Sequence, residues 1–256
     1  MSTETNDSAR TAAFNFARTL VPIYQAKLRE QLIGAYFLGT LAHGGYSHRY
    51  SDIDMALVTE NGLDEPTLTA LRGLAAEHDV TLGKKLSVFW SDRRFRTGRF
   101  PPLDRTDYLD NRIVLSEHER VLPARPTLDE IRAYLKGAPL SNWAESACRF
   151  AAMDMLTPDD HKAFIRALLY PARLVYSWTT GRLASNDNAV AFTCENRPLG
   201  MDTGLLRTAL AYRKAGADPG PLFPERGILP HQVESCIRFV TGPTGSFSAA
   251  RFSKSR

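Results

Sequence analysis

Residues 38–58 read LGTLAHGGYSHRYSDIDMALV. One apolar run ends in this stretch at Gly39 and Thr40, and a second apolar run begins around Asp52 and Asp54. Alternate residues of a strand point to the same face, so the two aspartates aim their carboxylates at one spot while the residue between them enters the core. The stretch therefore predicts two strands that are joined by a loop, with a pair of carboxylates at the start of the second strand.

The paired carboxylates of Asp52 and Asp54 predict a site for a hard cation. Mg²⁺ is commonly held by one or two carboxylates together with the phosphates of a substrate. Backbone amides at Gly39 and Thr40, with the Thr40 hydroxyl, are suited to hold phosphate oxygens where a helix begins. An Asp-x-Asp pair at a strand end is common by itself, and only its combination with the Gly-Thr turn favours a nucleoside triphosphate site.

Further elements are predicted on both sides of this stretch. The spacing of apolar residues predicts helices over 11–32 and 64–79, and alternation predicts a third strand over 85–90. From Thr127 onward helical signals dominate, beginning with a capping box at 127–130.

This distribution of strand and helix signals predicts two domains and a tail. Residues 1–125 are expected to form an α/β domain, in which helices pack on a small mixed sheet. Residues 126–243 are expected to form an all-α helical bundle, and residues 244–256 a flexible basic tail.

Composition limits the class of protein. The chain has 256 residues, of which 43% are apolar and 23% charged, as is ordinary for globular proteins. No run of eighteen apolar residues and no leader-like N-terminus is present, so we expect a cytoplasmic protein without a membrane partner. The three cysteines form no C-x-x-C pair, and scattered charge with a net value of +4 argues against a nucleic-acid-binding protein.

The compound pattern resembles the nucleotidyltransferases of the DNA polymerase β superfamily, whose hallmark is an apolar residue followed by G-[GS] and, after a loop, by D-h-[DE]. The positions of this hallmark are occupied by Gly39, Thr40, Asp52 and Asp54. The resemblance implies that the two aspartates hold Mg²⁺ against ATP. A hydroxyl of an acceptor then attacks the α-phosphorus, and pyrophosphate leaves.

A narrower resemblance is to the aminoglycoside 3''-adenylyltransferases. They share the glycine pair at 44–45 and SDID at 51–54, and the resemblance places Ser51, the first residue of SDID, at the nucleotide. Residues 172–198 are similar to a helical segment of that family, and the resemblance places Arg173 and Asn186 at the nucleotide. Asn186 stands where the family has a lysine.

The sequence departs from the family at the third acid, which acts there as base or metal ligand on a later strand. Lys85 and Ser87 occupy the expected positions. Asp92, at the end of the same strand, is the nearest acid to test as a catalytic base, and Lys85 is a candidate for a phosphate contact.

Two functions remain open. The first is an enzyme that transfers AMP from ATP to a small-molecule hydroxyl, with an aminoglycoside-like antibiotic as the acceptor that the resemblance implies. Residues 141–256 carry 14 basic and 10 acidic side chains, which instead favours a neutral or anionic acceptor. The second is a weakened nucleotide-binding regulator, or an antitoxin-type nucleotidyltransferase acting on a protein or RNA. The sequence leaves monomer and dimer open.

Overall fold

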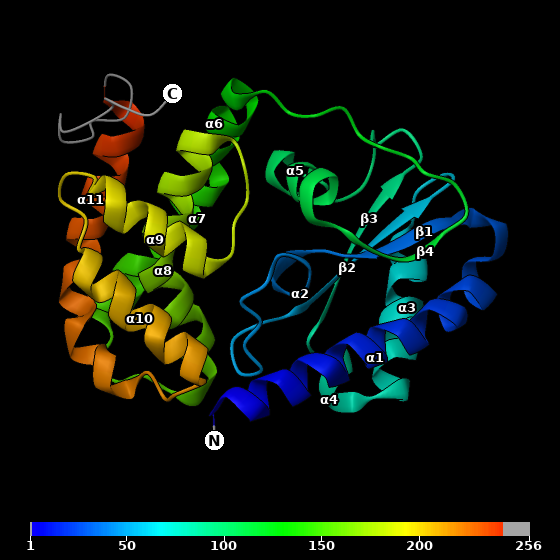
Figure 1. Cartoon of the computed structure of the whole chain (residues 1–256), viewed down its shortest axis with the longest axis horizontal. Helices are drawn as coiled ribbons and strands as arrows, with labels where there is room; N and C mark the ends of the chain where they lie inside the picture. The colour runs from blue at the N-terminus through cyan, green and yellow to red at the C-terminus, as the bar shows by residue number, and fades with distance from the viewer. Residues whose placement is uncertain (1, 243–256) are drawn as a thin grey trace. The chain divides into compact units, whose positions relative to one another are not determined.

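The computed structural model describes residues 2–242, so the predicted tail at 244–256 lies outside the described part. The chain divides into two compact units, Met1–Pro126 and Thr127–Arg256, which can be followed by colour in Figure 1. None of the helices in residues 2–242 has the length and apolar character needed to cross a membrane.

The first unit is built on a mixed sheet of four strands in the order β3-β2-β1-β4, which confirms the predicted mixed sheet. Its strands are β1 (Leu32–Phe37), β2 (Ile53–Thr59), β3 (Leu86–Asp92) and β4 (Ile113–Glu117). β1 runs antiparallel to β2 and β4, whereas β2 and β3 are parallel. β2, β3 and β4 therefore all finish at one end of the sheet. β1 finishes at the opposite end, where β2 and β3 begin.

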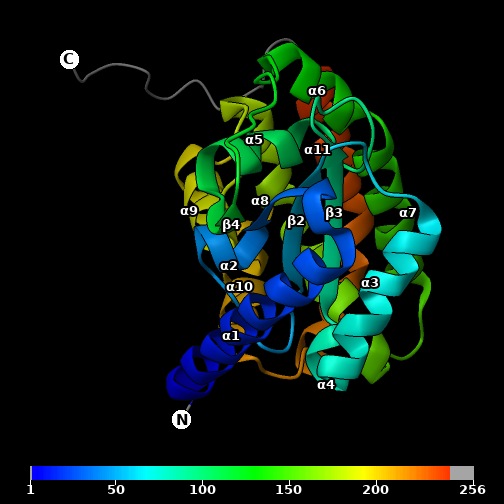
Figure 2. The same cartoon turned by 90° about the vertical axis from the view of Figure 1, so that its right-hand side faces the viewer.

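Helices cover both faces of this sheet, as Figures 1 and 2 show. They are α1 (Ser2–Leu28), the 3-10 turn η1 (Arg29–Gln31), α2 (Gly39–His43), α3 (Glu65–His78), α4 (Val80–Gly83) and α5 (Pro102–Asn111). One apolar core joins α1 and α3 to the face that carries Phe37 and Met55, and a second joins α5 to the face that carries Tyr36. β1 is buried along its whole length because both faces are covered.

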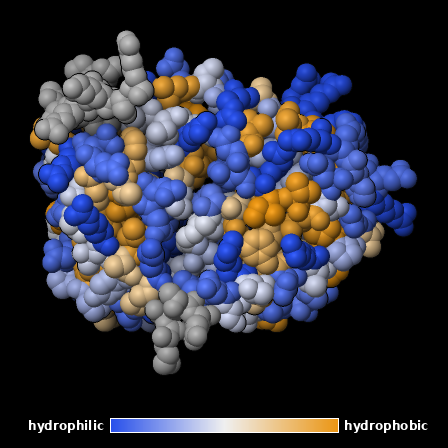
Figure 3. All heavy atoms as spheres, in the orientation of Figure 1, coloured by the Kyte–Doolittle hydropathy of each residue, from blue (hydrophilic) through white to orange (hydrophobic). Residues whose placement is uncertain are grey.

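The surface of the first unit is mixed in character. On the face shown in Figure 3, apolar residues gather over the strands of this unit, and hydrophilic residues surround them. Val114 on the edge strand β4 is 51% exposed.

The second unit contains helices and no strand within its described residues. Its helices are α6 (Leu128–Lys136), α7 (Ala138–Ala152), η2 (Pro158–Asp160), α8 (His161–Thr180), α9 (Asn186–Asn196), α10 (Thr203–Ala215), η3 (Gly220–Ile228) and α11 (Leu229–Thr241). The other α-helices of the unit pack around α8. The indole N–H of Trp143 donates to the carbonyl of Ala167 at 2.9 Å and so ties α7 to α8. The capping box of Thr127 and Glu130 is present at the start of α6, as predicted.

Candidate active site

Asp52 and Asp54 lie at the edge of the sheet where β2 begins. Both are half-buried, and Ile53 between them is fully buried. This alternation follows from the pleat of the strand, which turns Ile53 into the core and leaves the two carboxylates on the opposite face.

The turn after β1 touches this carboxylate pair. Gly39 has φ +62, and a Cβ added to it would lie 2.1 Å from Oδ2 of Asp54. The amide of Leu38 donates to the carbonyl of Asp54 at 2.9 Å. Only glycine has both the left-handed backbone and the absent side chain that this approach needs. The two halves of the sequence motif are therefore in direct contact.

The predicted phosphate cradle is only partly available. The Gly39 amide donates to Oδ2 of Asp107 at 2.8 Å, so it is already engaged, which corrects the expectation that it is a donor for phosphate. Oγ1 of Thr40 is buried and makes no hydrogen bond to any residue within 2–242. A buried hydroxyl without a partner loses the hydrogen bonds that it makes with water, so Thr40 is the residue of this turn whose polar group is unsatisfied.

Asp107 is a residue that the sequence analysis missed. It lies on α5, is only 3% exposed, and its second oxygen accepts from the side-chain amide of Asn111 at 2.8 Å. The helix carries three aspartates at intervals of three residues, and nothing in its sequence distinguishes Asp107 from Asp104 and Asp110. Its position beside Gly39 arises from tertiary packing alone.

Ser51 and Lys85 shape the loop that leads to Asp52. The buried hydroxyl of Ser51 accepts from the amide of Ser47 at 3.0 Å, and Nζ of Lys85 donates to the carbonyl of His48. These two predicted nucleotide contacts therefore have structural partners within the loop itself. Their contact with a nucleotide stays a prediction.

Tyr46 reports the charge of Asp52. Burial raises the pKa of the Tyr46 phenol, and the nearby negative charge of Asp52 raises this pKa further. Tyr46 is only 8% exposed, which accounts for the effect of burial on this pKa.

The strand register settles the position of the expected third acid. Asp54 is paired with Ser87 on β3, so Ser87 is the residue beside the carboxylate pair. Asp92 is paired with Thr59 at the other end of the two strands. Five residues of strand rise separate these positions by roughly 16 Å. Asp92 as catalytic base is therefore wrong, and its carboxylate instead accepts from the amide of Arg96 at 2.7 Å.

Arg173 and Asn186 both lie in the second unit. Arg173 is exposed on α8, and Asn186 is the first residue of α9, next to the capping hydroxyl of Ser185. Burial raises the pKa of Tyr170, and the positive charge of Arg173 acts in the opposite direction. Their contact with a nucleotide stays a prediction.

The donor set at Asp52 and Asp54 fits Mg²⁺ better than a transition metal. Residues 2–242 contain no group of three His, Cys, Asp or Glu side chains that could hold a metal. Two carboxylates alone are a suitable protein contribution to Mg²⁺ when phosphate oxygens and water complete the shell. Close contact of Gly39 with Asp54 fixes one of the two carboxylates in place.

No protein-family model and no curated protein sequence matches the chain. Among solved structures, the chain is similar to the crystal structure of spectinomycin adenyltransferase AAD(9) from Enterococcus faecialis with ATP and spectinomycin. The TM-score is 0.60 at 13% identity, over 88% of this chain and 99% of that chain. At this identity the likeness shows the fold alone: the chain is folded like that adenyltransferase.

Proposed function

We propose that the chain is an Mg²⁺-dependent nucleotidyltransferase that transfers AMP from ATP to a hydroxyl of a small-molecule acceptor. The observation that carries this proposal is the contact of Gly39 with Asp54, which joins the Gly-Thr turn to the carboxylate pair. In this chain the arrangement lies on a fold that is similar to the fold of an adenyltransferase solved with ATP.

The residues of the first unit have separate tasks in this proposal. Asp52 and Asp54 would hold Mg²⁺, which neutralises phosphate charge and orients the triphosphate when bound. Thr40 offers its hydroxyl to a phosphate oxygen, and Lys85 fixes the loop before Asp52 through the His48 carbonyl. Asp107 holds the turn through the Gly39 amide. The acceptor hydroxyl gives up its proton to water, its oxygen attacks the α-phosphorus, and the bond to the pyrophosphate oxygen breaks, so that pyrophosphate leaves.

Calorimetry with Mg-ATP tests the nucleotide site. We expect Asp52→Asn and Asp54→Asn each to abolish metal-dependent ATP binding while the thermal unfolding temperature stays close to that of the wild type, because both side chains are partly exposed. Asp79→Asn is the matched control, since Asp79 caps α4 and asparagine caps equally well. Unchanged Mg-ATP affinity in both site variants would show that the site is wrongly placed.

A nucleotide-binding regulator is the second candidate, and Ser87 is the observation that favours it. This residue stands beside Asp54 where the resemblance implies a third acid. A label-transfer assay with each α-labelled nucleotide, Mg²⁺ and a panel of hydroxylated acceptors separates the two candidates. The enzyme labels at least one acceptor, and Asp52→Asn does not. The regulator binds Mg-ATP and labels none.

The acceptor has two candidate classes. The similar structure holds spectinomycin, which favours an aminoglycoside-type antibiotic. The basic excess of residues 141–256 favours a neutral or anionic hydroxylated metabolite, because like charge disfavours a polycation. Expression in a sensitive bacterium decides between them: protection from spectinomycin or streptomycin that disappears in Asp52→Asn supports the antibiotic, and no protection supports the metabolite.

A further inference from the structure

A second pocket lies at the edge of the sheet opposite to Asp52 and Asp54. It has a volume of about 750 Å³, and its wall is formed by the segments that directly follow β2, β3 and β4. This volume lies within the range of pockets that bind small molecules, about 300–1,000 Å³. Because the three strands all end at this edge, their following segments converge on one space.

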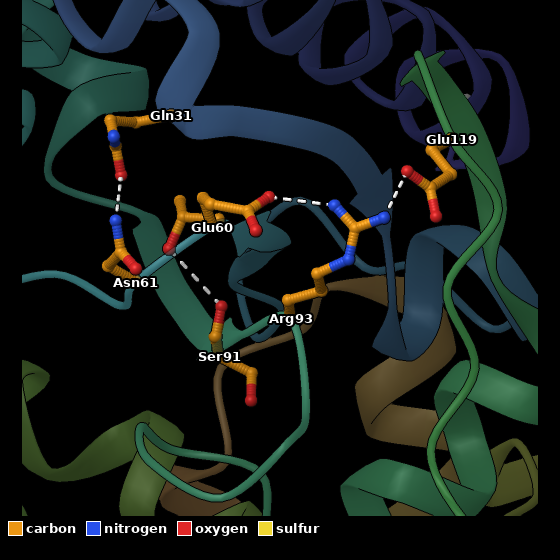
Figure 4. Close-up of polar contacts among 7 residues, drawn as sticks. Gln31, Glu60, Asn61, Ser91, Arg93 and Glu119 are labelled. Atoms are coloured by element: carbon orange, nitrogen blue, oxygen red, sulfur yellow. Dashed lines mark hydrogen bonds and ion pairs between the residues drawn. The ribbon is translucent and has the colours of Figure 1, made fainter.

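An ion-pair clamp holds these segments together, as Figure 4 shows. Nη1 of Arg93 bonds Oε2 of Glu60 at 2.8 Å, and Nη2 of the same guanidinium bonds Glu119. Arg93 follows β3, Glu60 follows β2 and Glu119 follows β4. One guanidinium therefore pairs with two glutamates, which leaves one of their two negative charges unbalanced. With Asp92, the lining carries four arginines and three acids, a net charge of +1.

The third acid of the pocket is also engaged. Asp92 bonds the backbone amide of Arg96 and so stabilises the turn after β3. Within the pocket, the described residues therefore offer no carboxylate that is uncommitted to another group.

Three arginines of the same pocket have no such partner. The side chains of Arg94, Arg96 and Arg120 are exposed and make no hydrogen bond or ion pair with any residue in the described range 2–242. Cations gathered in a concave site raise the local positive potential, which attracts anions. The planar guanidinium fork also matches the geometry of phosphate oxygens, which it binds by two parallel hydrogen bonds.

We propose that this pocket is a second binding site, specific for a small ligand that carries a diphosphate group. Arg94, Arg96 and Arg120 would bind the phosphate oxygens, and the partly exposed Leu122 offers apolar contact to the organic part of the ligand.

The site is separate from the proposed reaction centre. The register of β2 and β3 puts roughly 16 Å of strand between Asp54 and Thr59, which adjoins the pocket. A ligand bound by these arginines therefore does not reach Asp52 or Asp54, and its binding does not depend on their metal.

Calorimetry with inorganic pyrophosphate in the presence of EDTA tests the proposal. The chelator removes divalent metal, so the metal-dependent site at Asp52 and Asp54 does not bind pyrophosphate. We expect the wild type and Asp52→Asn to bind pyrophosphate equally. The double variant Arg94→Gln/Arg120→Gln should bind at least about tenfold more weakly, since two of the three proposed guanidinium contacts to phosphate are lost. The control is Arg10→Gln/Arg18→Gln on α1, which removes the same charge from exposed positions outside the pocket.

Four outcomes would overturn the proposal. They are no pyrophosphate binding by the wild type, equal weakening in the control double variant, loss of binding in Asp52→Asn, and citrate binding as tightly as pyrophosphate. A single-stranded RNA oligonucleotide forms a further arm. Arginine-dependent binding of RNA without binding of pyrophosphate would assign the pocket to nucleic acid instead. The pyrophosphate experiment uses no metal, so its result does not depend on whether the chain binds Mg-ATP.

Discussion

Asp107 accepts a hydrogen bond from the backbone amide of Gly39 at 2.8 Å. Asp107 lies on α5, a helix that no sequence pattern connects with the turn at Gly39. Gly39 in turn lies against the carboxylate of Asp54. A buried acid on α5 thus fixes the turn, and the turn fixes one member of the carboxylate pair. The site depends on packing behind it as well as on the residues that face the ligand.

Replacement of Asp107 by alanine is expected to destabilise the first unit by about 1–3 kcal/mol, because the partly buried Gly39 amide loses its acceptor. Chemical denaturation measures this loss. Asp110→Ala on the same helix is the control: it removes an exposed ion pair with Arg125, for which about 0–1 kcal/mol is expected. Equal losses in the two variants would contradict the role of Asp107.

The elements that sequence patterns predicted well are those with local causes. β2 follows from its own apolar run, and the start of α6 follows from the capping box of Thr127 and Glu130. β4 and α5 were not predicted. β4 is a short run whose strand character comes from pairing with β1, which is distant in the sequence. Pairing of this kind leaves little trace in local composition.

The same distinction applies to the candidate site. The placement of Asp52 and Asp54 beside Gly39 follows from motif spacing and strand alternation. The error over Asp92 arose because nearness in sequence was taken as nearness in space, whereas a strand carries its two ends far apart. The engagement of Gly39 by Asp107 is a tertiary contact, which no single-sequence pattern reveals.

Gly39→Ala should destabilise the chain by at least about 1–2 kcal/mol, the cost of a left-handed conformation for an L-residue, and should weaken Mg-ATP binding by displacing Asp54. Gly73→Ala is a control with the opposite sign. Gly73 lies inside α3, and a Cβ there meets nothing within 4 Å. Alanine should therefore stabilise this helix by about 0.5–1 kcal/mol. Thermal unfolding and calorimetry measure both effects, and a neutral Gly39→Ala would contradict the contact with Asp54.

The phenol of Tyr46 should report the charge state of Asp52. Burial raises the pKa of Tyr46 most, and the negative charge of Asp52 raises it further because it disfavours the phenolate. Asp52→Asn removes only the second cause, so the pKa of Tyr46 should fall but stay above the ordinary value of about 10. The chain has nine tyrosines, so the phenolate absorbance is measured as a difference from Tyr46→Phe in each background. An unchanged pKa would show that Asp52 does not act on Tyr46.

The raised pKa of Tyr46 also determines how stability changes at alkaline pH. The folded pKa of Tyr46 is raised above the unfolded value of about 10, so the neutral phenol stabilises the fold below that pH. Stability should then fall as the pH rises above about 10, and Tyr46→Phe should show a smaller fall than the wild type. Denaturation at a series of alkaline pH values measures the difference.

Ser87→Asp should convert the carboxylate pair into a site with three carboxylates. Ser87 is half-buried and paired with Asp54 across parallel strands, so its side chain lies on the same face. Without a divalent cation, the added charge should lower stability by about 0.2–1 kcal/mol through repulsion between neighbouring strands. With Mg²⁺, the third ligand should raise metal affinity, and stability should rise with the ratio of metal concentration to Kd.

Thermal unfolding with and without Mg²⁺ measures both parts of this prediction for Ser87→Asp. Ser87→Asn is the matched control, because asparagine has nearly the same shape as aspartate and carries no charge. The Asp variant should unfold at a lower temperature than the Asn variant in EDTA, and Mg²⁺ should raise its unfolding temperature more. An equal Mg²⁺ response in the two variants would mean that no metal is held beside Asp54. A larger response accompanied by faster AMP transfer would show that the missing acid limits the reaction, since a positioned general base is typically worth about 10²–10⁴ in rate.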